Sequence, residues 1–229
     1  MNLGIAEGDR VLVHADLRIF FKVQGGVDEI IDILRDAVGQ RGVILTPSFT
    51  FSFPGRFDIQ ESASRIGGMT TLFSRQSDVK RVPDGMTSYY LLGSSADEFV
   101  NAWDHSSYGE NSIVGQLVAT GGKVLQFGTD ILSPIHYVEQ MVGVPYRELK
   151  RFEGIICDRS ATFSSYTDFY CRTQEIKKVI PDPIREEYYL HRSPVEYLSH
   201  RAIRAFSVSD FVDFAAPRLE NDKFILMET

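Results

Sequence analysis

The chain has 229 residues, of which 43% are hydrophobic, so it can bury one full core, and we expect a single domain spanning 1–229. Its net charge of −7 does not suit a sequence-independent nucleic-acid binder, because such binding rests on neutralising phosphates. No apolar run approaches the ~18 residues of a membrane span, and the N-terminus lacks the basic-then-apolar order of a signal peptide. We therefore expect a cytoplasmic protein with neither a membrane nor a nucleic-acid partner.

The first part of the chain alternates strand and helix signals. Short, apolar, valine-rich or isoleucine-rich segments at 10–15 and 43–49 are typical of buried strands. The segment between them, 28–38, carries apolar residues at helical spacing and stops at Gly39. A strand, a crossover helix and a second strand predict a parallel sheet.

The alternation continues less regularly along the chain. Helices are predicted at 67–76 and 94–103, and strands at 88–93 and 123–128. The next segment, 133–143, has proline in its first turn and ends at a glycine, which predicts a short helix capped by Ser133.

The second half has a different texture. Aromatic and β-branched residues at 147–172 predict antiparallel strands. A last helix at 208–222 contains Pro217, which we expect to bend or end it, and 224–227 could add an edge strand. The stretch 47–65 has no clear element, and loops of that length are usually functional or mobile. The expected class is α/β: a central, mostly parallel mixed sheet flanked by helices, plus an antiparallel β portion.

Several common sites are absent as motifs. The two cysteines, Cys157 and Cys171, belong to no metal-ligand spacing, and we expect free thiols. No HExxH pair or calcium loop occurs, so no metal is expected. The sequence also lacks GxSxG, GxGxxG and GxxxxGK[ST], which removes the commonest hydrolase, dinucleotide and nucleotide-triphosphate readings.

One histidine has a carboxylate partner at helical spacing. In SPIHYVEQ, residues 133–140, His136 and Glu139 are three apart and share a helix face just after a buried strand. Open α/β sheets bind ligands at that position, and a carboxylate can fix the tautomer of a general-base imidazole. From the pattern alone, an ordinary helix histidine with a glutamate neighbour is the more frequent case.

The remaining histidines give weaker signals. His14 ends a buried strand, where a hydrogen-bonded core role and a catalytic role are equally open. His105 lies in a polar loop and could line a pocket, whereas His191 and His200 are expected on the surface of helices.

Several segments, taken in order, resemble one family. VHADL at 13–17 is similar to a strand ending VHxSL, and GGVDEII and GVILTPSFT follow it as a glycine-opened helix and a strand do in that family. GGKVLQFGTDILSPIHYVEQ resembles a strand leading to an L-H-x-x-E segment, and PYR follows at 145–147. The order of these matches, over nearly the whole chain, resembles the aminoglycoside 3-N-acetyltransferase family.

The resemblance implies an acetyl-CoA-dependent acyltransferase of mixed α/β fold that acetylates an amino group of an aminoglycoside or related amino sugar. It implies that His136 is the catalytic histidine and Glu139 its acidic companion. Two departures stand out: Asp16 replaces the serine of VHxSL, and RVPDGM at 81–86 replaces a His-Pro segment. A biosynthetic acceptor therefore stays open beside antibiotic resistance.

Candidate binding residues fall into two groups. Acetyl-CoA, with its phosphates, would contact residues around VHADL and hydroxyls that could also serve the oxyanion, namely His14, Asp16, Leu17, Arg18, Thr87, Ser88 and Ser112. Lys22, Arg81 and the amides of a helix opened by Gly25 and Gly26 could add positive charge. A cationic acceptor would be attracted by acidic residues, for which the candidates are Asp84, Asp104, Glu110 and Asp168, with Glu153 in addition. Each of these could equally be a solvated side chain or a turn residue.

The sequence leaves three alternative functions open: N-acetylation of a small-molecule amine, hydrolysis of an acyl-CoA thioester by the same His and Glu, and non-catalytic binding of CoA or sugar. The protein is expected to act as a monomer or homodimer.

Overall fold

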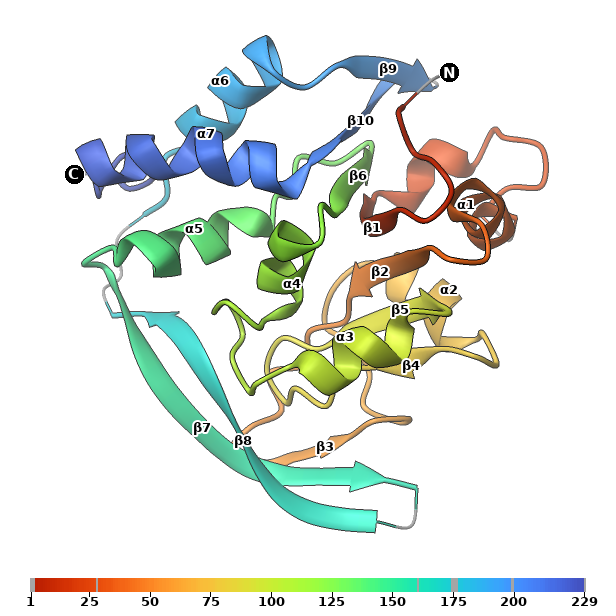
Figure 1. Cartoon of the computed structure of the whole chain (residues 1–229), viewed down its shortest axis with the longest axis vertical. Coiled ribbons are helices and arrows are strands. Elements are labelled where there is room, and N and C mark those ends of the chain that lie inside the picture. The colour runs from red at the N-terminus through yellow and green to blue at the C-terminus, as the bar shows by residue number, and fades with distance from the viewer. Residues whose placement is uncertain (1–2, 28, 160, 174–176, 199, 229) are drawn as a thin grey trace.

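Seven strands form the main sheet of the computed structural model, which describes residues 3–27, 29–159, 161–173, 177–198 and 200–228 (Figure 1). In spatial order they are β4 (Lys80–Arg81), β5 (Tyr89–Gly93), β2 (Val43–Pro47), β1 (Arg10–Ala15), β6 (Lys123–Phe127), β10 (Arg201–Ser207) and β9 (Val195–Leu198). β1 pairs in parallel with both β2 and β6, whereas β5 and β10 are antiparallel to their neighbours. The α/β class with a mixed central sheet is confirmed. Within this sheet the pairings β1–β2 and β1–β6 are parallel and the other four are antiparallel, so it is less parallel than expected.

Helices cover both faces of this sheet, because successive residues of each strand point to opposite sides. On β1, Val11 and Val13 pack into one hydrophobic cluster and Leu12 into the other. The first face is covered by η1 (Leu17–Phe20), α1 (Ile30–Val38) and α2 (Met69–Ser74). The second face is covered by α3 (Ala96–Ala102), α4 (Ile113–Ala119), α5 (Pro134–Val142), α6 (Pro183–His191) and α7 (Val208–Asn221). α5 packs against α7, as Figure 1 shows.

The predicted antiparallel portion is a long hairpin of β7 (Arg147–Asp158) and β8 (Ala161–Arg172). It joins β3 (Arg56–Asp58) in a second sheet of order β3-β7-β8, and β3 lies inside the stretch that carried no predicted element. In Figure 1 the hairpin leaves the end of α5 and curves along one edge of the molecule. Its first residue, Arg147, is thereby held beside α5.

The structure corrects several predicted elements. α1 begins at Ile30 after Glu29, and Gly25 and Gly26 adopt positive φ angles of 79° and 61° ahead of it, so these glycines do not open the helix. Asp28, the expected first residue of that helix, lies outside the described residues. His200 lies in a turn between β9 and β10 with φ 66°, and is therefore not a helix residue.

The C-terminal predictions were also wrong in part. α7 continues through Pro217 to Asn221, because Ala215 and Leu219 on either side of the proline are both fully buried and hold the helix against the core. The segment 224–227 makes a turn and one isolated bridge, from Met227 to Lys178, because Leu226 and Met227 pack into the core. It does not extend either sheet.

Arg81, expected to offer charge to a cofactor, is instead a buried residue that holds neighbouring backbone segments, with 5% of its surface exposed. Its guanidinium lies over the rings of Phe57 and Tyr90, at 4.8 and 4.6 Å from their centroids. Its donors reach one hydroxyl and three backbone carbonyls: Ser88 Oγ at 3.3 Å, and the oxygens of Ser48 at 3.2 Å, Ile59 at 3.2 Å and Ser62 at 2.7 Å. Arg81 therefore fastens 48–62 to the main sheet.

Replacing Arg81 by methionine should lower the free energy of unfolding by about 3 kcal/mol, because buried carbonyls lose their donors. Urea denaturation of both proteins measures the difference. The matched control is Arg65→Met at an exposed arginine of the same region, where a change within about 0.5 kcal/mol is expected. An equal loss of unfolding free energy in the two variants would contradict this role of Arg81.

Candidate functional site

The site forms where α5 begins, beyond the carboxyl end of β6. Pro134 occupies the first turn of α5, and Gly143 ends the helix in the left-handed conformation with φ 69°. His136 and Glu139 lie on one face of this helix, about one turn apart, because they are separated by three residues. Glu139 is completely buried, whereas 22% of the His136 side chain is exposed.

The buried carboxylate of Glu139 is surrounded by donors. His136 Nδ1 lies 2.5 Å from its Oε2, and the hydroxyl of Tyr146 donates to its Oε1 at 2.9 Å. Arg147 forms an ion pair with it, with 3.0 Å between Nε and Oε2. Arg147 is itself fixed by donating from Nη1 to the carbonyl of Tyr170 at 3.0 Å. A buried charge is tolerated when it is paired in this way.

These contacts select one tautomer of His136. Nδ1 also lies 3.2 Å from Arg147 Nη2, but a guanidinium can only donate, so that bond would require a lone pair on Nδ1. The contact with the carboxylate is shorter and requires a proton on Nδ1. We assign the proton to Nδ1, which leaves the lone pair of Nε2 able to accept a proton from another group.

The same contacts set the ionisation of the pair. Burial favours the neutral acid of Glu139, but the hydrogen bond from His136 and the charges of His136 and Arg147 outweigh it and lower the pKa of Glu139 to about 2. Burial lowers the pKa of His136, and the charge of Arg147 lowers it further against the opposing pull of Glu139. At neutral pH the imidazole is therefore an uncharged base beside an ionised carboxylate.

Aromatic side chains surround the imidazole. The ring of Tyr108 lies 5.1 Å from that of His136, and Phe169 of β8 lies 5.6 Å from Tyr108. Burial raises the pKa of the Tyr108 hydroxyl well above its ordinary value, so the phenol stays neutral. These rings restrict the access of water to the base.

A cavity of about 190 Å³ lies next to the start of α5, at the carboxyl ends of β1 and β2. Its walls are mostly apolar, and its lining residues are Val13, His14, Ala15, Thr46, Pro47, Phe49, Ile66, Gly67, Met69, Thr70, Ile131 and Ser133. His14 is buried, with 5% of its surface exposed, and its Nε2 lies 3.0 Å from Ser133 Oγ. Burial lowers the pKa of His14 to about 4, so this imidazole is also neutral.

The cavity adjoins a positively charged cluster. Asp16 follows the cavity residue Ala15 and accepts hydrogen bonds from Arg18 Nε at 2.8 Å and from Arg201 Nη1 at 2.8 Å. The bonds from Arg18, and the charges of Arg18 and Arg201, hold the pKa of Asp16 far below its usual range against the effect of burial. One carboxylate between two guanidinium groups leaves a net positive charge, and Leu17 beside it is half-buried against the core.

Four predicted residues are buried and occupied in other ways. Thr87 donates to Asp84 at 2.8 Å, Ser88 donates to the carbonyl of Val82 at 2.7 Å, and Ser112 caps α4 by accepting from the amide of Gly115 at 3.2 Å. Asp84 is 1% exposed and also accepts from the amide of Met86 and the hydroxyl of Thr167. Burial raises the pKa of Asp84. The side chains of these four residues therefore make their hydrogen bonds within the protein.

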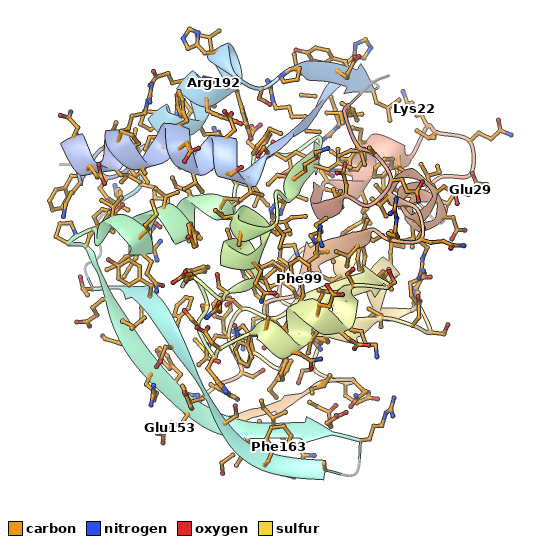
Figure 2. The ribbon with its side chains drawn as sticks, viewed as in Figure 1. Lys22, Glu29, Phe99, Glu153, Phe163 and Arg192 are labelled. Carbon is orange, nitrogen blue, oxygen red and sulfur yellow. The ribbon has the colours of Figure 1, made fainter. Side chains whose placement is uncertain are left out.

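The other predicted acidic residues do not gather at His136. Asp168 pairs with Arg151 through two bonds of 2.8 Å, and Asp104 accepts from Asn111 and from the amide of Ser106 within its own loop. Glu110 is exposed and borders a different hollow, between α3 and α4. Figure 2 shows Glu153 on the outer part of the hairpin and Lys22 on the loop that precedes α1.

The sequence patterns assign no role to Arg147 or Tyr146 and indicate Ser133 only as a helix cap. No local pattern marks Arg147 as the partner of Glu139, because the burial of that carboxylate, which requires a cation, arises only in the fold. His105, which could line a pocket, stacks on Tyr166 with 4.4 Å between the rings and contacts its carbonyl through Nδ1 at 3.0 Å.

Within the described ranges, no group of three or more His, Cys, Asp or Glu side chains is placed to hold a metal ion. Over the same residues, no helix has the length and apolar character needed to cross a membrane. Cys157 is buried and Cys171 half-buried, and both thiols are free.

The buried, neutral His14 makes stability depend on pH. The unfolded histidine binds a proton near its ordinary pKa of 6.5, whereas the native one resists protonation until about pH 4, so stability is lost as pH falls through this window. His14→Gln keeps a donor beside Ser133 without titrating, and it should remove up to about 3 kcal/mol of that pH-dependent loss. Urea denaturation at several pH values checks this, with the exposed His191→Gln as control. Identical pH slopes in the wild type and His14→Gln would contradict it.

The chain matches known proteins in sequence. It fits the profile of the family described as aminoglycoside 3-N-acetyltransferase over residues 12–220. It is 26% identical to the aminoglycoside N(3)-acetyltransferase VII of Streptomyces paromomycinus over 192 residues, which cover 72% of this chain and 66% of that protein. It is also 26% identical to a prophage-derived aminoglycoside N(3')-acetyltransferase-like protein of Bacillus subtilis (strain 168), over 93% of this chain and 86% of the relative.

Solved structures share the fold. The binary complex of AAC-IIIb with CoASH superposes with a TM-score of 0.82 at 23% identity, covering 96% of this chain and 92% of the other. Sisomicin-bound AAC-VIa superposes with a TM-score of 0.81 at 20% identity, covering 96% and 94%. The family match includes every residue of the site around His136 and of the cavity beside it. The chain belongs to the aminoglycoside 3-N-acetyltransferase family.

Proposed function

We propose that this protein transfers the acetyl group of acetyl-CoA to an amino group of an aminoglycoside or a related amino sugar, with His136 as the general base. The observation that carries the proposal is the arrangement of His136, Glu139 and Arg147 beside the cavity lined by His14 and Ser133. Family membership supports the reaction class. We also propose that residues 1–229 form a single catalytic domain.

The contacts of His136 suit the proton transfers of this reaction. An ammonium group must lose a proton before its nitrogen can attack a thioester, and the lone pair on Nε2 of neutral His136 accepts it. The nitrogen then bonds to the carbonyl carbon, the carbon–sulfur bond breaks, and the thiolate takes that proton from the imidazolium. The nitrogen releases its second proton to water as the neutral amide forms. Glu139, kept ionised by Arg147, stabilises that imidazolium and fixes the ring through Nδ1.

The cavity suits the acyl end of the co-substrate. Its apolar walls fit an alkyl thioester, and it opens at the carboxyl ends of parallel strands, where open α/β sheets bind ligands. The cluster of Arg18, Asp16 and Arg201 supplies net positive charge next to Ala15, which suits the phosphates of CoA. His14, Asp16, Leu17 and Arg18 therefore remain our proposed CoA residues.

The acceptor is proposed to be a cationic small molecule. The relatives are named for aminoglycosides, one related structure is bound to sisomicin, and the net charge of −7 suits a polyamine. Asp104, Glu110 and Asp168 are the acidic candidates that keep exposed or half-exposed side chains. Because acetyl-CoA is the donor, we propose action in the cytoplasm, by a monomer or homodimer.

The test measures thiol release from acetyl-CoA with and without a panel of aminoglycosides, nucleotide-linked amino sugars and simple amines. We expect release that requires an amine, and a fall of at least about 10²-fold in kcat for His136→Ala, because a positioned base contributes that much. His191→Ala, at an exposed histidine at the end of α6, is the control and should keep full activity.

Two outcomes would replace the proposal. Thiol release without any amine would identify a thioesterase. CoA binding by calorimetry with no turnover across the panel would identify a binding protein without catalysis. Full activity in His136→Ala would refute the assigned base.

A further inference from the structure

Ser133 occupies the N-cap position of α5 but does not cap the helix. Its backbone is already helical, with φ −63° and ψ −30°, and its side chain makes no hydrogen bond to the first turn. An N-cap serine normally spends its hydroxyl on a free amide of the helix. Here the hydroxyl is turned to His14 Nε2 at 3.0 Å, although Ser133 is only 6% exposed. The hydroxyl is therefore oriented by the end of β1 and not by α5.

His14 is built to donate to this hydroxyl. It is buried at the end of β1, where its neutral state is favoured, and its Nε2 is the atom that faces Ser133. A hydroxyl has two acceptor sites and one proton. When Nε2 carries its proton and donates, Ser133 keeps its own proton for a further acceptor.

The cavity offers no competing hydroxyl. Of the other lining hydroxyls, Thr46 donates to the carbonyl of Val13 at 3.2 Å and Thr70 to that of Gly67 at 2.7 Å. The remaining lining residues, apart from His14, contribute apolar side chains or none. Among the described residues that line this cavity, Ser133 is thus the hydroxyl that is not bonded to a backbone carbonyl.

Ser133 also has a fixed relation to the base. Its carbonyl accepts the amide of His136 at 3.1 Å, and residues three apart share a helix face. A thioester in the cavity would have Ser133 on one side of its carbonyl group and would be open to an amine that His136 deprotonates. Negative charge develops on the carbonyl oxygen as the amine attacks, and a preoriented donor in an apolar site stabilises that charge.

We propose that the hydroxyl of Ser133 donates a hydrogen bond to the carbonyl oxygen of the bound thioester and to the oxyanion formed from it, and that His14 is the positioning residue for this hydroxyl. The inference rests on the proposed acetyl transfer. Ser133 keeps its proton throughout: the bond that forms joins the amine nitrogen to the carbonyl carbon, and the bond that breaks joins that carbon to sulfur. No acyl-serine is formed, because a His14 Nε2 that already carries its proton and donates to Ser133 cannot accept the proton of that hydroxyl.

Binding without turnover tests the contact directly. The probes are a ketone analogue of acetyl-CoA, in which a methylene replaces the thioester sulfur, and S-ethyl-CoA, which lacks the carbonyl. Calorimetry on the wild type should show about threefold to tenfold tighter binding of the ketone, the worth of one hydrogen bond. Ser133→Ala should lose this preference and bind S-ethyl-CoA as the wild type does, whereas Ser133→Thr, which keeps a hydroxyl, should retain it.

Kinetics separate this role from a structural one. Ser133→Ala should lower kcat about 10²-fold, the effect of removing one oxyanion donor, while KM for acetyl-CoA rises by no more than about tenfold, the worth of the bond made in the ground state. His14→Gln, whose amide can still donate to Ser133, should retain more activity than His14→Leu, which cannot. Circular dichroism and the Tm of each variant report whether it is folded, and the calorimetry with S-ethyl-CoA reports whether the cavity is intact.

The outcomes distinguish this inference from the proposed function. A wild type that binds both analogues equally, full kcat in Ser133→Ala, or an acetyl group covalently attached to Ser133 after mixing with acetyl-CoA would each overturn it. A ketone preference that depends on Ser133, in a protein that acetylates no amine, would overturn only the transfer reaction. A wild type that binds neither analogue would overturn both.

Discussion

The buried carboxylate of Glu139 is the constraint on which the rest of the site depends. A charge with no exposure to water is stable in a protein only if donors surround it, and here they come from three consecutive parts of the chain: α5, the turn after it and β7. His136 supplies one donor, Tyr146 the second and Arg147 the third. The pairing of one buried charge thus joins α5, which carries His136, to the hairpin of β7 and β8.

The topology of the sheet explains why the end of β1 and the start of α5 are neighbours. Parallel pairing of β1 with both β2 and β6 brings the carboxyl ends of all three strands to one edge. His14 is the last residue but one of β1, Thr46 and Pro47 end β2, and α5 follows β6 after a short loop. Residues more than a hundred positions apart, such as His14 and Ser133, therefore reach hydrogen-bond distance without any long connection.

Local sequence patterns predicted the features of this structure that depend only on residues close together in the chain. Helical spacing was enough to pair His136 with Glu139, and valine-rich runs were enough to find β1 and β2. Hydroxyl and acidic residues carry no such information: Asp84 reads as a loop carboxylate, but Thr167, from a strand 83 residues later, helps to bury it. Ser133 looked like a cap because its position is one, and only the approach of β1 shows that its hydroxyl is used differently. Arg81 was taken for a surface cation because nothing in its own segment reveals the two rings that enclose it.

The way in which Arg81 holds the stretch 48–62 affects how that stretch can change. The guanidinium contacts the backbone oxygens of Ser48, Ile59 and Ser62, and every residue type offers the same oxygen. The three bonds therefore do not depend on which exposed side chains the stretch carries, whereas the buried Phe53 and Phe57 belong to a hydrophobic cluster. Phe49, the second residue of this stretch, lines the cavity and packs edge-on against Phe51 and Tyr89. A different side chain at position 49 would therefore alter the volume of the cavity, while Arg81 still holds the backbone on both sides of it.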